Sequence, residues 1–135
     1  FGLLRVKHII DSLEKLKDDI WAKKTAAVLR KRSPLMLHVT LEQIRKARRM
    51  TLADNLRMER DMVHHCFYLR PGESSETVEG IRALAVDKDY TPKWNPARIE
   101  DVKPGMADAF FVSPWTADTH PLRSLGQVSG ASTAP

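Results

Sequence analysis

Apolar residues in the first half of the chain recur at three- and four-residue steps, which is the period of an amphipathic helix. The first stripe comprises Val6, Ile9, Ile10, Leu13, Leu16 and Ile20. A second helix is expected after Asp18 and Asp19, whose carboxylates can accept hydrogen bonds from a helix N-terminus. It would end in a basic run before Ser33 and Pro34. The pattern therefore predicts two helices within residues 6–32.

Two further helices carry explicit start signals. Ser33 followed by Pro34 predicts a helix start, because proline lacks an amide that the first turn would leave unpaired. Thr51 with Asp54 three residues later predicts a fourth start of the capping-box type. The third helix has the stripe Leu37, Leu41 and Ile44. The fourth ends before Pro71, and its expected shared face consists of Leu52, Leu56, Val63 and Phe67, with Met62, Cys66 and Leu69 beside it.

The second half of the chain has weaker patterns. Residues 78–86 predict a short buried helix, and the prolines within residues 87–96 predict an ordered extended segment. A last short helix is expected around residues 106–111. Proline, glycine, serine and threonine dilute the pattern from Ser113 onward. We therefore expect a mainly α fold of about five helices over residues 1–112 and an extended or disordered tail over residues 113–135.

Composition places the chain among ordinary globular proteins. Hydrophobic residues make up 42% and charged residues 29% of its 135 residues. No apolar run approaches the roughly 20 residues that a membrane helix needs. The one cysteine, Cys66, excludes an internal disulfide and suits a reducing compartment. A chain of this length can bury only a modest core, so several apolar stripes are expected to pack on something outside it. Since the first residue is Phe1, we expect that either a leader has been removed or the chain is the tail of a longer protein, with the tail favoured.

Positive charge is concentrated at the start of the chain. Residues 1–50 hold 13 Lys and Arg against 5 Asp and Glu, whereas the whole chain has a formal net charge of +5. Such clusters can contact nucleic-acid phosphates, or they can be solvated helix ends that complement the helix dipole. The candidate phosphate-binding residues are Lys23, Lys24, Arg30, Lys31, Arg32, Arg45, Lys46, Arg48 and Arg49.

No residue pattern predicts a catalytic or metal site. Glu59 and Asp61 are two positions apart, so they point to different sides of a helix and are expected to be solvated. Consecutive residues on a helix cannot converge on one ion, which argues against a metal at His64, His65 and Cys66. The common nucleotide-binding, zinc-protease and serine-nucleophile motifs are also missing from the sequence. We predict no catalytic residue, no metal and no resident cofactor.

Three stretches carry a family resemblance. They are WAKKTAAVLRKRSPLMLHVTLEQIRKA from Trp21, TLADNLRMERDM from Thr51 and EGIRALAVDKDYTPKWNPARIEDV from Glu79. In this order they resemble the C-terminal part of the 3-hydroxyisobutyryl-CoA hydrolase branch of the crotonase (enoyl-CoA hydratase) superfamily, over roughly residues 3–111. The sequence departs from the family at Thr77 and Val78, where an aromatic residue is usual two positions before the EG pair.

The resemblance implies a helical region that packs on a spiral β/α core and contributes to subunit contacts. In the family, the oxyanion hole and the acidic residues that activate water belong to that core, so this chain alone is not expected to be an enzyme. Lys88, Lys93 and Trp94 could contact the phosphates and adenine of coenzyme A. Alternatively, Trp94 anchors the extended segment to the helices, while Asp87 and Asp89 pair with the neighbouring lysines.

Two functional hypotheses follow from the resemblance, and both imply a location in the mitochondrial matrix. In the first, the chain is a non-catalytic structural subunit or fragment in a large assembly, for which the small subunit of the mitochondrial ribosome is the leading candidate. Its partners would be protein subunits or a separate crotonase core, with ribosomal RNA contacted through its backbone. In the second, the chain is the C-terminal part of an active 3-hydroxyisobutyryl-CoA hydrolase of valine breakdown.

Overall fold

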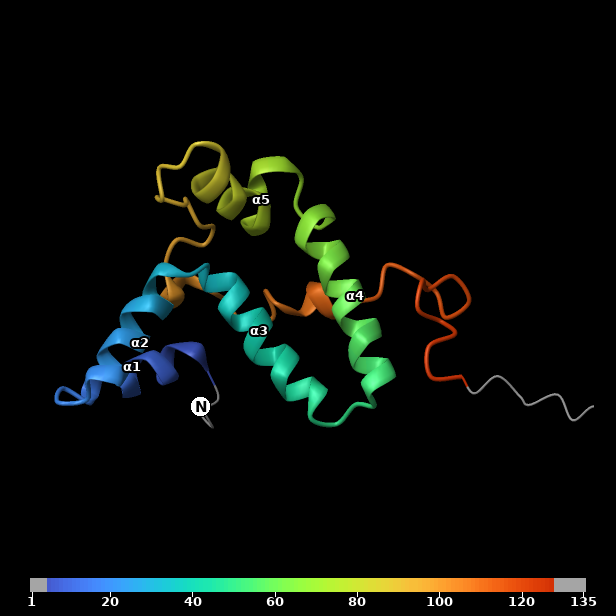
Figure 1. The fold of residues 1–135 in the computed structure, drawn as a ribbon, viewed down its shortest axis with the longest axis horizontal. Coiled ribbons are helices and arrows are strands. Elements are labelled where there is room, and N and C mark those ends of the chain that lie inside the picture. Colours follow the sequence, from blue (N-terminus) through green and yellow to red (C-terminus); the bar gives the residue numbers. More distant parts are fainter. Residues whose placement is uncertain (1–4, 128–135) are drawn as a thin grey trace, which may run out of the picture.

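The computed structural model describes residues 5–127, and these form helices, turns and irregular segments without a β-strand (Figure 1). The mainly α fold expected from the sequence is therefore confirmed for this part of the chain. The elements in chain order are α1 (Val6–Lys15), α2 (Ile20–Lys31), α3 (Pro34–Ala47), α4 (Leu52–Tyr68), the 3₁₀ turn η1 (Gly72–Ser74), α5 (Glu76–Ile81), the π-helical turn η2 (Arg82–Val86), and the 3₁₀ turns η3 (Ile99–Asp101) and η4 (Asp108–Phe111).

Side-chain caps fix three of the helix starts at the predicted positions. Asp19 accepts a hydrogen bond from the amide of Ala22 at 3.0 Å and begins α2. Ser33 accepts one from the amide of Met36 at 3.2 Å and begins α3. Thr51 accepts one from the amide of Asp54 and begins α4. Each cap satisfies an amide that has no partner within its own helix.

The core is divided into small clusters. α1 and α2 pack side by side around Ile9, Leu13, Ala22 and Ala26. Next to them, Val6 and Ile10 of α1 meet Ile99 of η3. α3 and α4 form the two arms of a V in Figure 1, and η4 lies between them. The third cluster fills that space with Leu35, Val39, Met58, Met62 and Phe110.

Several predicted core positions are in fact exposed. α1 ends at Lys15, so Leu16 and Ile20 lie beyond its buried stripe and are 51% and 70% exposed. Of the apolar residues expected in a buried helix at 78–86, only Ala83 is buried, because the chain there is divided between α5 and η2. The expected face of α4 exists but points outward: Leu52, Leu56, Val63 and Phe67 are exposed. Met58 and Met62, on the opposite side, face the core instead.

The chain after η4 runs back along α4 in a series of turns (Figure 1). We call residues 113–127 the strap. Arg57 of α4 donates to the backbone carbonyl oxygens of Leu122, Arg123 and Leu125 in the strap. The remainder of the expected tail, residues 128–135, lies outside the described residues. Within residues 5–127, no helix is long and apolar enough to cross a bilayer.

Candidate functional site

Arg82 organises the segment that carries the most distinctive sequence motif. Its guanidinium donates to both carboxylate oxygens of Glu79 at 2.8 and 2.7 Å. It also donates to Asp87 at 2.6 Å and to Asp89 at 2.8 Å. The two aspartates therefore pair with Arg82. The hypothesis that Trp94 is an anchor expected them to pair with the neighbouring lysines, and this part of the hypothesis is wrong. A planar guanidinium suits this task because its donors can serve several acceptors at fixed angles.

Glu79 is the buried end of this network, with 5% of its surface exposed. Its hydrogen bonds to Arg82 and to the backbone amide of Lys93 lower its pKa from 4.5 to about 2. The same guanidinium, together with the amide of Thr91, lowers the pKa of Asp89. Both carboxylates are therefore ionised at neutral pH, so neither is poised to act as a general acid or base there.

Trp94 lies against α5 and is tied to α2. Its indole Nε1 donates to the carbonyl oxygen of Lys31 at 3.1 Å, and its ring packs over Gly80. The next amide, of Asn95, donates to the buried carboxylate of Glu76 at 2.8 Å. That carboxylate also accepts a hydrogen bond from Ser33. Trp94 therefore has the contacts of an anchor that joins the extended segment to α2 and α5.

The three residues proposed for coenzyme A are not brought together at one site. Trp94 lines a cavity of about 290 Å³ whose polar rim comprises Lys31 and Arg32, and whose walls include Val28, Leu84 and Tyr90. Lys88 and Lys93 are not among its lining residues. Lys93 contributes its backbone amide to Glu79, and Lys88 has a positive φ of 55° in the turn. A contact of these residues with coenzyme A stays a prediction.

The first basic cluster contains one cation that is committed to internal ion pairs. Arg30 donates to Glu14 at 2.9 Å and to Glu100 at 2.9 Å, which joins α1, α2 and η3. These contacts raise the pKa of Arg30 and lower the pKa of Glu14 and of Glu100. Arg30 is therefore neutralised within the chain. Its neighbours in this cluster are exposed, namely Lys23, Lys24, Lys31 and Arg32.

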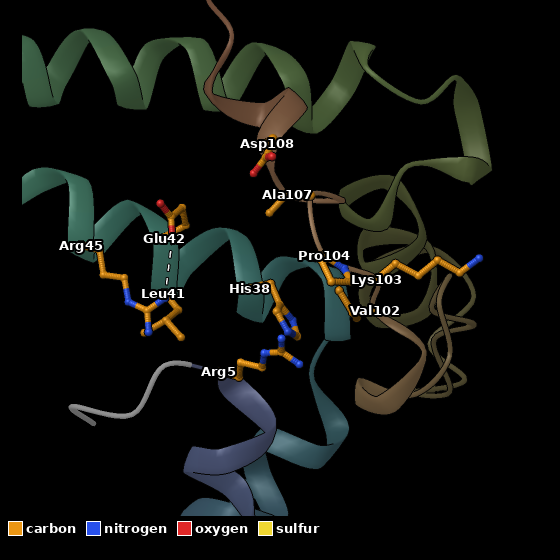
Figure 2. Close-up of a pocket in the computed structure, with 11 residues that line it drawn as sticks. Arg5, His38, Leu41, Glu42, Arg45, Val102, Lys103, Pro104, Ala107 and Asp108 are labelled. Carbon is orange, nitrogen blue, oxygen red and sulfur yellow. Dashed lines mark ion pairs between the residues drawn. The ribbon is translucent and has the colours of Figure 1, made fainter.

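The second basic cluster surrounds the C-terminal end of α3. Arg48 and Arg49 are exposed in the turn before α4. Arg45 and Lys46 each lie 3.8 Å from Glu42. Figure 2 shows Arg45 and Glu42 at one end of a hollow that reaches Arg5 and Lys103. This cluster therefore keeps a surplus of positive charge.

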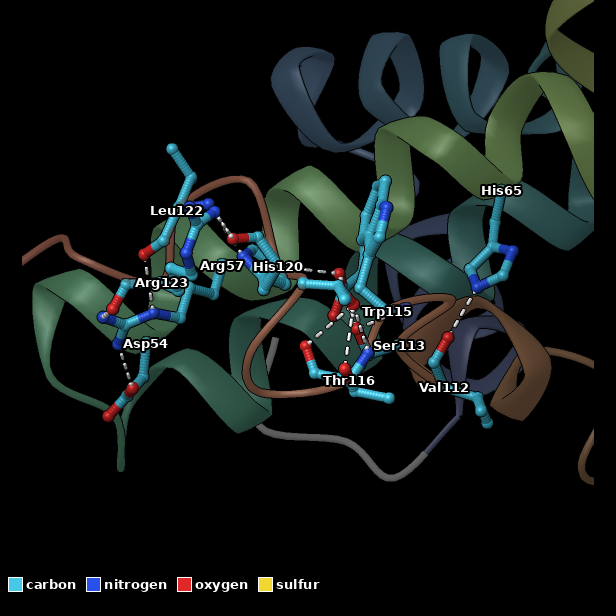
Figure 3. Close-up of polar contacts among 12 residues, drawn as sticks. Asp54, Arg57, His65, Val112, Ser113, Trp115, Thr116, His120, Leu122 and Arg123 are labelled. Carbon is cyan, nitrogen blue, oxygen red and sulfur yellow. Dashed lines mark hydrogen bonds and ion pairs between the residues drawn. The ribbon is translucent and has the colours of Figure 1, made fainter.

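A buried carboxylate on α4 was missed from the sequence. Asp61 is 8% exposed and not solvated as expected. It lies 3.0 Å from Nε2 of His120 and accepts a hydrogen bond from Ser113 at 3.1 Å. Figure 3 shows these two strap residues together with Trp115. Trp115 covers this contact, since its ring stacks edge-on with His120 at 5.4 Å and lies beneath Arg60. Asp61 therefore holds the strap onto α4. The two-residue separation of Asp61 from Glu59 in the sequence did not predict this contact with the strap.

Among residues 5–127, no three His, Cys, Asp or Glu side chains gather as the ligands of a metal ion would. His64 stacks on Tyr68 at 4.6 Å. His65 contacts the carbonyl oxygen of Val112 at 2.6 Å through its Nε2. The paired histidines thus serve packing on α4 and contact with the segment after η4.

Comparison with known proteins matches this chain to one family. A family model described as enoyl-CoA hydratase/isomerase matches residues 1–111. The small ribosomal subunit protein mS47 of Arabidopsis thaliana is 40% identical over 114 residues, covering 82% of this chain and 27% of that protein. The 3-hydroxyisobutyryl-CoA hydrolase 1 of the same plant is 38% identical, covering 82% and 30%. The mitochondrial 3-hydroxyisobutyryl-CoA hydrolase of Mus musculus is 33% identical, covering 87% and 29%.

The chain therefore belongs to the enoyl-CoA hydratase/isomerase family, the crotonase superfamily. Within it, the chain belongs to the 3-hydroxyisobutyryl-CoA hydrolase-like branch. The expected mitochondrial location is confirmed by relatives from Dictyostelium discoideum and Mus musculus whose names state it. The chain spans less than a third of the length of these relatives. The strap lies beyond the matched residues 1–111.

Proposed function

We propose that this chain is the helical docking region of a non-catalytic crotonase-like protein that serves as a structural subunit of the small mitochondrial ribosomal subunit, in the matrix. The observation that carries the proposal is the outward apolar face of α4. Val63 and Phe67 on this face are 54% and 44% exposed, and Leu52 at its start is 74% exposed. Apolar faces of this kind on a folded chain mark interaction sites.

Further apolar side chains extend this exposed surface onto other helices. Ile20, Trp21 and Val28 of α2 and Leu84 of η2 are between 50% and 70% exposed. The polar contacts differ from these apolar faces because they lie within the chain. Arg82, Arg30 and Asp61 each contact other residues of the same chain. We infer that the apolar faces pack on a β/α core and on neighbouring subunits, while the ionic contacts maintain the shape of the region.

Similarity to a ribosomal protein supports the assembly. The relative named as a small ribosomal subunit protein is 40% identical to this chain, and the basic end of α3 suits a particle rich in RNA. A second candidate is the C-terminal part of an active 3-hydroxyisobutyryl-CoA hydrolase. It is supported by the hydrolase relatives and by the ordered Arg82 network within the family's most distinctive motif.

Depletion of the protein from its mitochondria tests the choice between the two candidates. The structural role predicts that assembled small ribosomal subunits decline and that clearance of 3-hydroxyisobutyryl-CoA continues at its normal rate. Re-expression of the natural protein should restore the particle. Accumulation of the thioester with normal ribosomes would overturn the structural role and establish the hydrolase.

A further inference from the structure

The C-terminal end of α3 presents a concave basic surface. We call it the α3-end surface, and it consists of Arg45, Lys46, Arg48 and Arg49 around a hollow of about 440 Å³. One carboxylate, Glu42, also lines this hollow and lies 3.8 Å from both Arg45 and Lys46. The lining therefore holds four cations and one carboxylate, which leaves a surplus of positive charge around the hollow.

A second hollow continues this surface along α3. It has a volume of about 190 Å³ and shares Glu42 and Arg45 with the first (Figure 2). It adds the cations Arg5 and Lys103 and one further carboxylate, Asp108. The two adjoining hollows together hold six cations and two carboxylates. Two adjoining basic hollows can bind a negatively charged polymer at more than one of its charged groups.

The helix dipole alone does not account for this concentration of charge. Cations near a helix C-terminus stabilise it by about 0.3–1 kcal/mol at the surface, an effect that fades within the last turn. Arg48 is the C-cap of α3 and Arg49 follows it, so the dipole favours both. Arg5 and Lys103 come from other parts of the chain and add charge that the dipole of α3 does not explain. The other basic cluster differs, because its central cation Arg30 is neutralised by Glu14 and Glu100.

The chemistry of the α3-end surface favours phosphate. Guanidinium groups bind phosphate oxygens through two parallel hydrogen bonds, and three of the four cations are arginines. Base stacking would need an uncovered aromatic ring. The ring of Phe111 is covered by the Lys46 ammonium, which lies 5.2 Å from its centre. The surface is therefore suited to the sugar-phosphate backbone and not to the bases.

We infer that the α3-end surface binds the phosphate backbone of RNA, independently of base sequence. The inference rests on the proposed function, since it names the RNA contact of a ribosomal subunit. Arg48 and Arg49 make the decisive contacts, because both are exposed and neither is held by an ion pair within the described chain. Lys15 and Lys17 form a matched control: they are also two exposed cations near a helix end, but they lie at the end of α1 and in the turn after it, outside both basic clusters.

Binding of a labelled single-stranded RNA of mixed sequence to the full-length protein, measured by fluorescence anisotropy over a range of salt concentrations, tests the inference. Each lost phosphate contact lowers the slope of log affinity against log salt by roughly 0.7. Arg48→Gln with Arg49→Gln should reduce that slope by roughly 1.4 and weaken binding about tenfold at physiological salt. Lys15→Gln with Lys17→Gln should change neither quantity.

Variants that preserve the positive charge distinguish weaker RNA binding caused by a lost phosphate contact from weaker binding caused by misfolding. Arg48→Lys with Arg49→Lys should restore most of the salt slope, since lysine still neutralises a phosphate. An equal loss in the Lys15 and Lys17 control would overturn the inference, because binding would then follow net charge alone. Loss of ribosome association with unchanged RNA affinity would also overturn it, in favour of an acidic protein partner. In that case the proposed function would stand.

Discussion

The Cη2 atom of Trp94 lies 3.3 Å from the position that a Cβ atom on Gly80 would occupy. The ring cannot easily retreat, because its Nε1 is hydrogen-bonded to the carbonyl oxygen of Lys31. Gly80 lies in α5 with an ordinary helical backbone, so close approach and not a special φ is the reason for glycine here. This packing relationship joins α2, α5 and the extended segment at one point.

Replacing Gly80 with alanine should destabilise this junction. Alanine gains about 0.5–1 kcal/mol in helix propensity, whereas overpacking costs about 1–3 kcal/mol. The net change should be a loss of about 1 kcal/mol, seen as faster amide hydrogen exchange in α5 and residues 87–95. In a Trp94→Leu background, the same replacement should be neutral or stabilising. An equal loss in both backgrounds would show that the ring is not the obstacle.

Order in the extended segment should depend on acid pH through Glu79. The pKa of this carboxyl falls from 4.5 to about 2 on folding. A lowered pKa means that its stabilising contribution is complete above pH 4.5 and is lost as the pH falls toward 2. The protection factors of the amides across residues 87–95, which correct the exchange rates for the intrinsic effect of pH, should therefore fall over that range. Glu79→Gln should already show the lower protection factors at pH 7 and a weaker dependence on pH. A pH dependence equal to that of the natural protein would contradict this account.

Replacing Asp61 of α4, whose buried carboxylate contacts the strap, should detach the strap from α4. Asp61→Ala leaves the buried His120 without its acceptor, which costs about 1–3 kcal/mol. We expect faster proteolytic cleavage within residues 113–127. Asp118→Ala removes an exposed carboxylate from the strap itself and serves as the control. Similar cleavage rates in the two variants would show that the Asp61 contact does not hold the strap.

The outward face of α4 should behave as a buried face in the full-length protein. Phe67 is 44% exposed in this chain, and replacing an exposed residue changes stability by about 0.5 kcal/mol or less. If the β/α core covers it, Phe67→Ala should cost about 3–5 kcal/mol. Thermal unfolding of the full-length protein measures this, with Thr40→Ala on α3 as the exposed control. A cost equal to that of the control would contradict docking through this face.

Local signals in the sequence predicted the helix starts. Asp19, Ser33 and Thr51 each cap an amide three residues later, so the information lies within one turn of chain. The period of α4 also predicted which residues share a face. It could not say whether Val63 or Met62 faces inward, because that depends on η4, which arrives from more than forty residues away.

The contacts of the candidate site were harder to predict from the sequence, because they also join residues that are distant along the chain. Asp61 is buried because His120 and Ser113 reach it from a segment whose composition indicates a tail. Asp87 and Asp89 bind Arg82 because the turn folds back on α5, although lysines are nearer in sequence. Charge counting found both basic clusters, but only the structure separates the neutralised Arg30 from the exposed Arg48 and Arg49.

Sedimentation of the native protein from a mitochondrial extract, at low and at high salt, tests the structural role most directly. Each fraction is assayed for this protein, for RNA and for hydroxyacyl-CoA thioesterase activity. We expect the protein to migrate with an RNA-containing particle of ribosomal size that lacks the activity, and to leave it after ribonuclease treatment. Migration as a small oligomer that coincides with thioesterase activity would contradict the structural role.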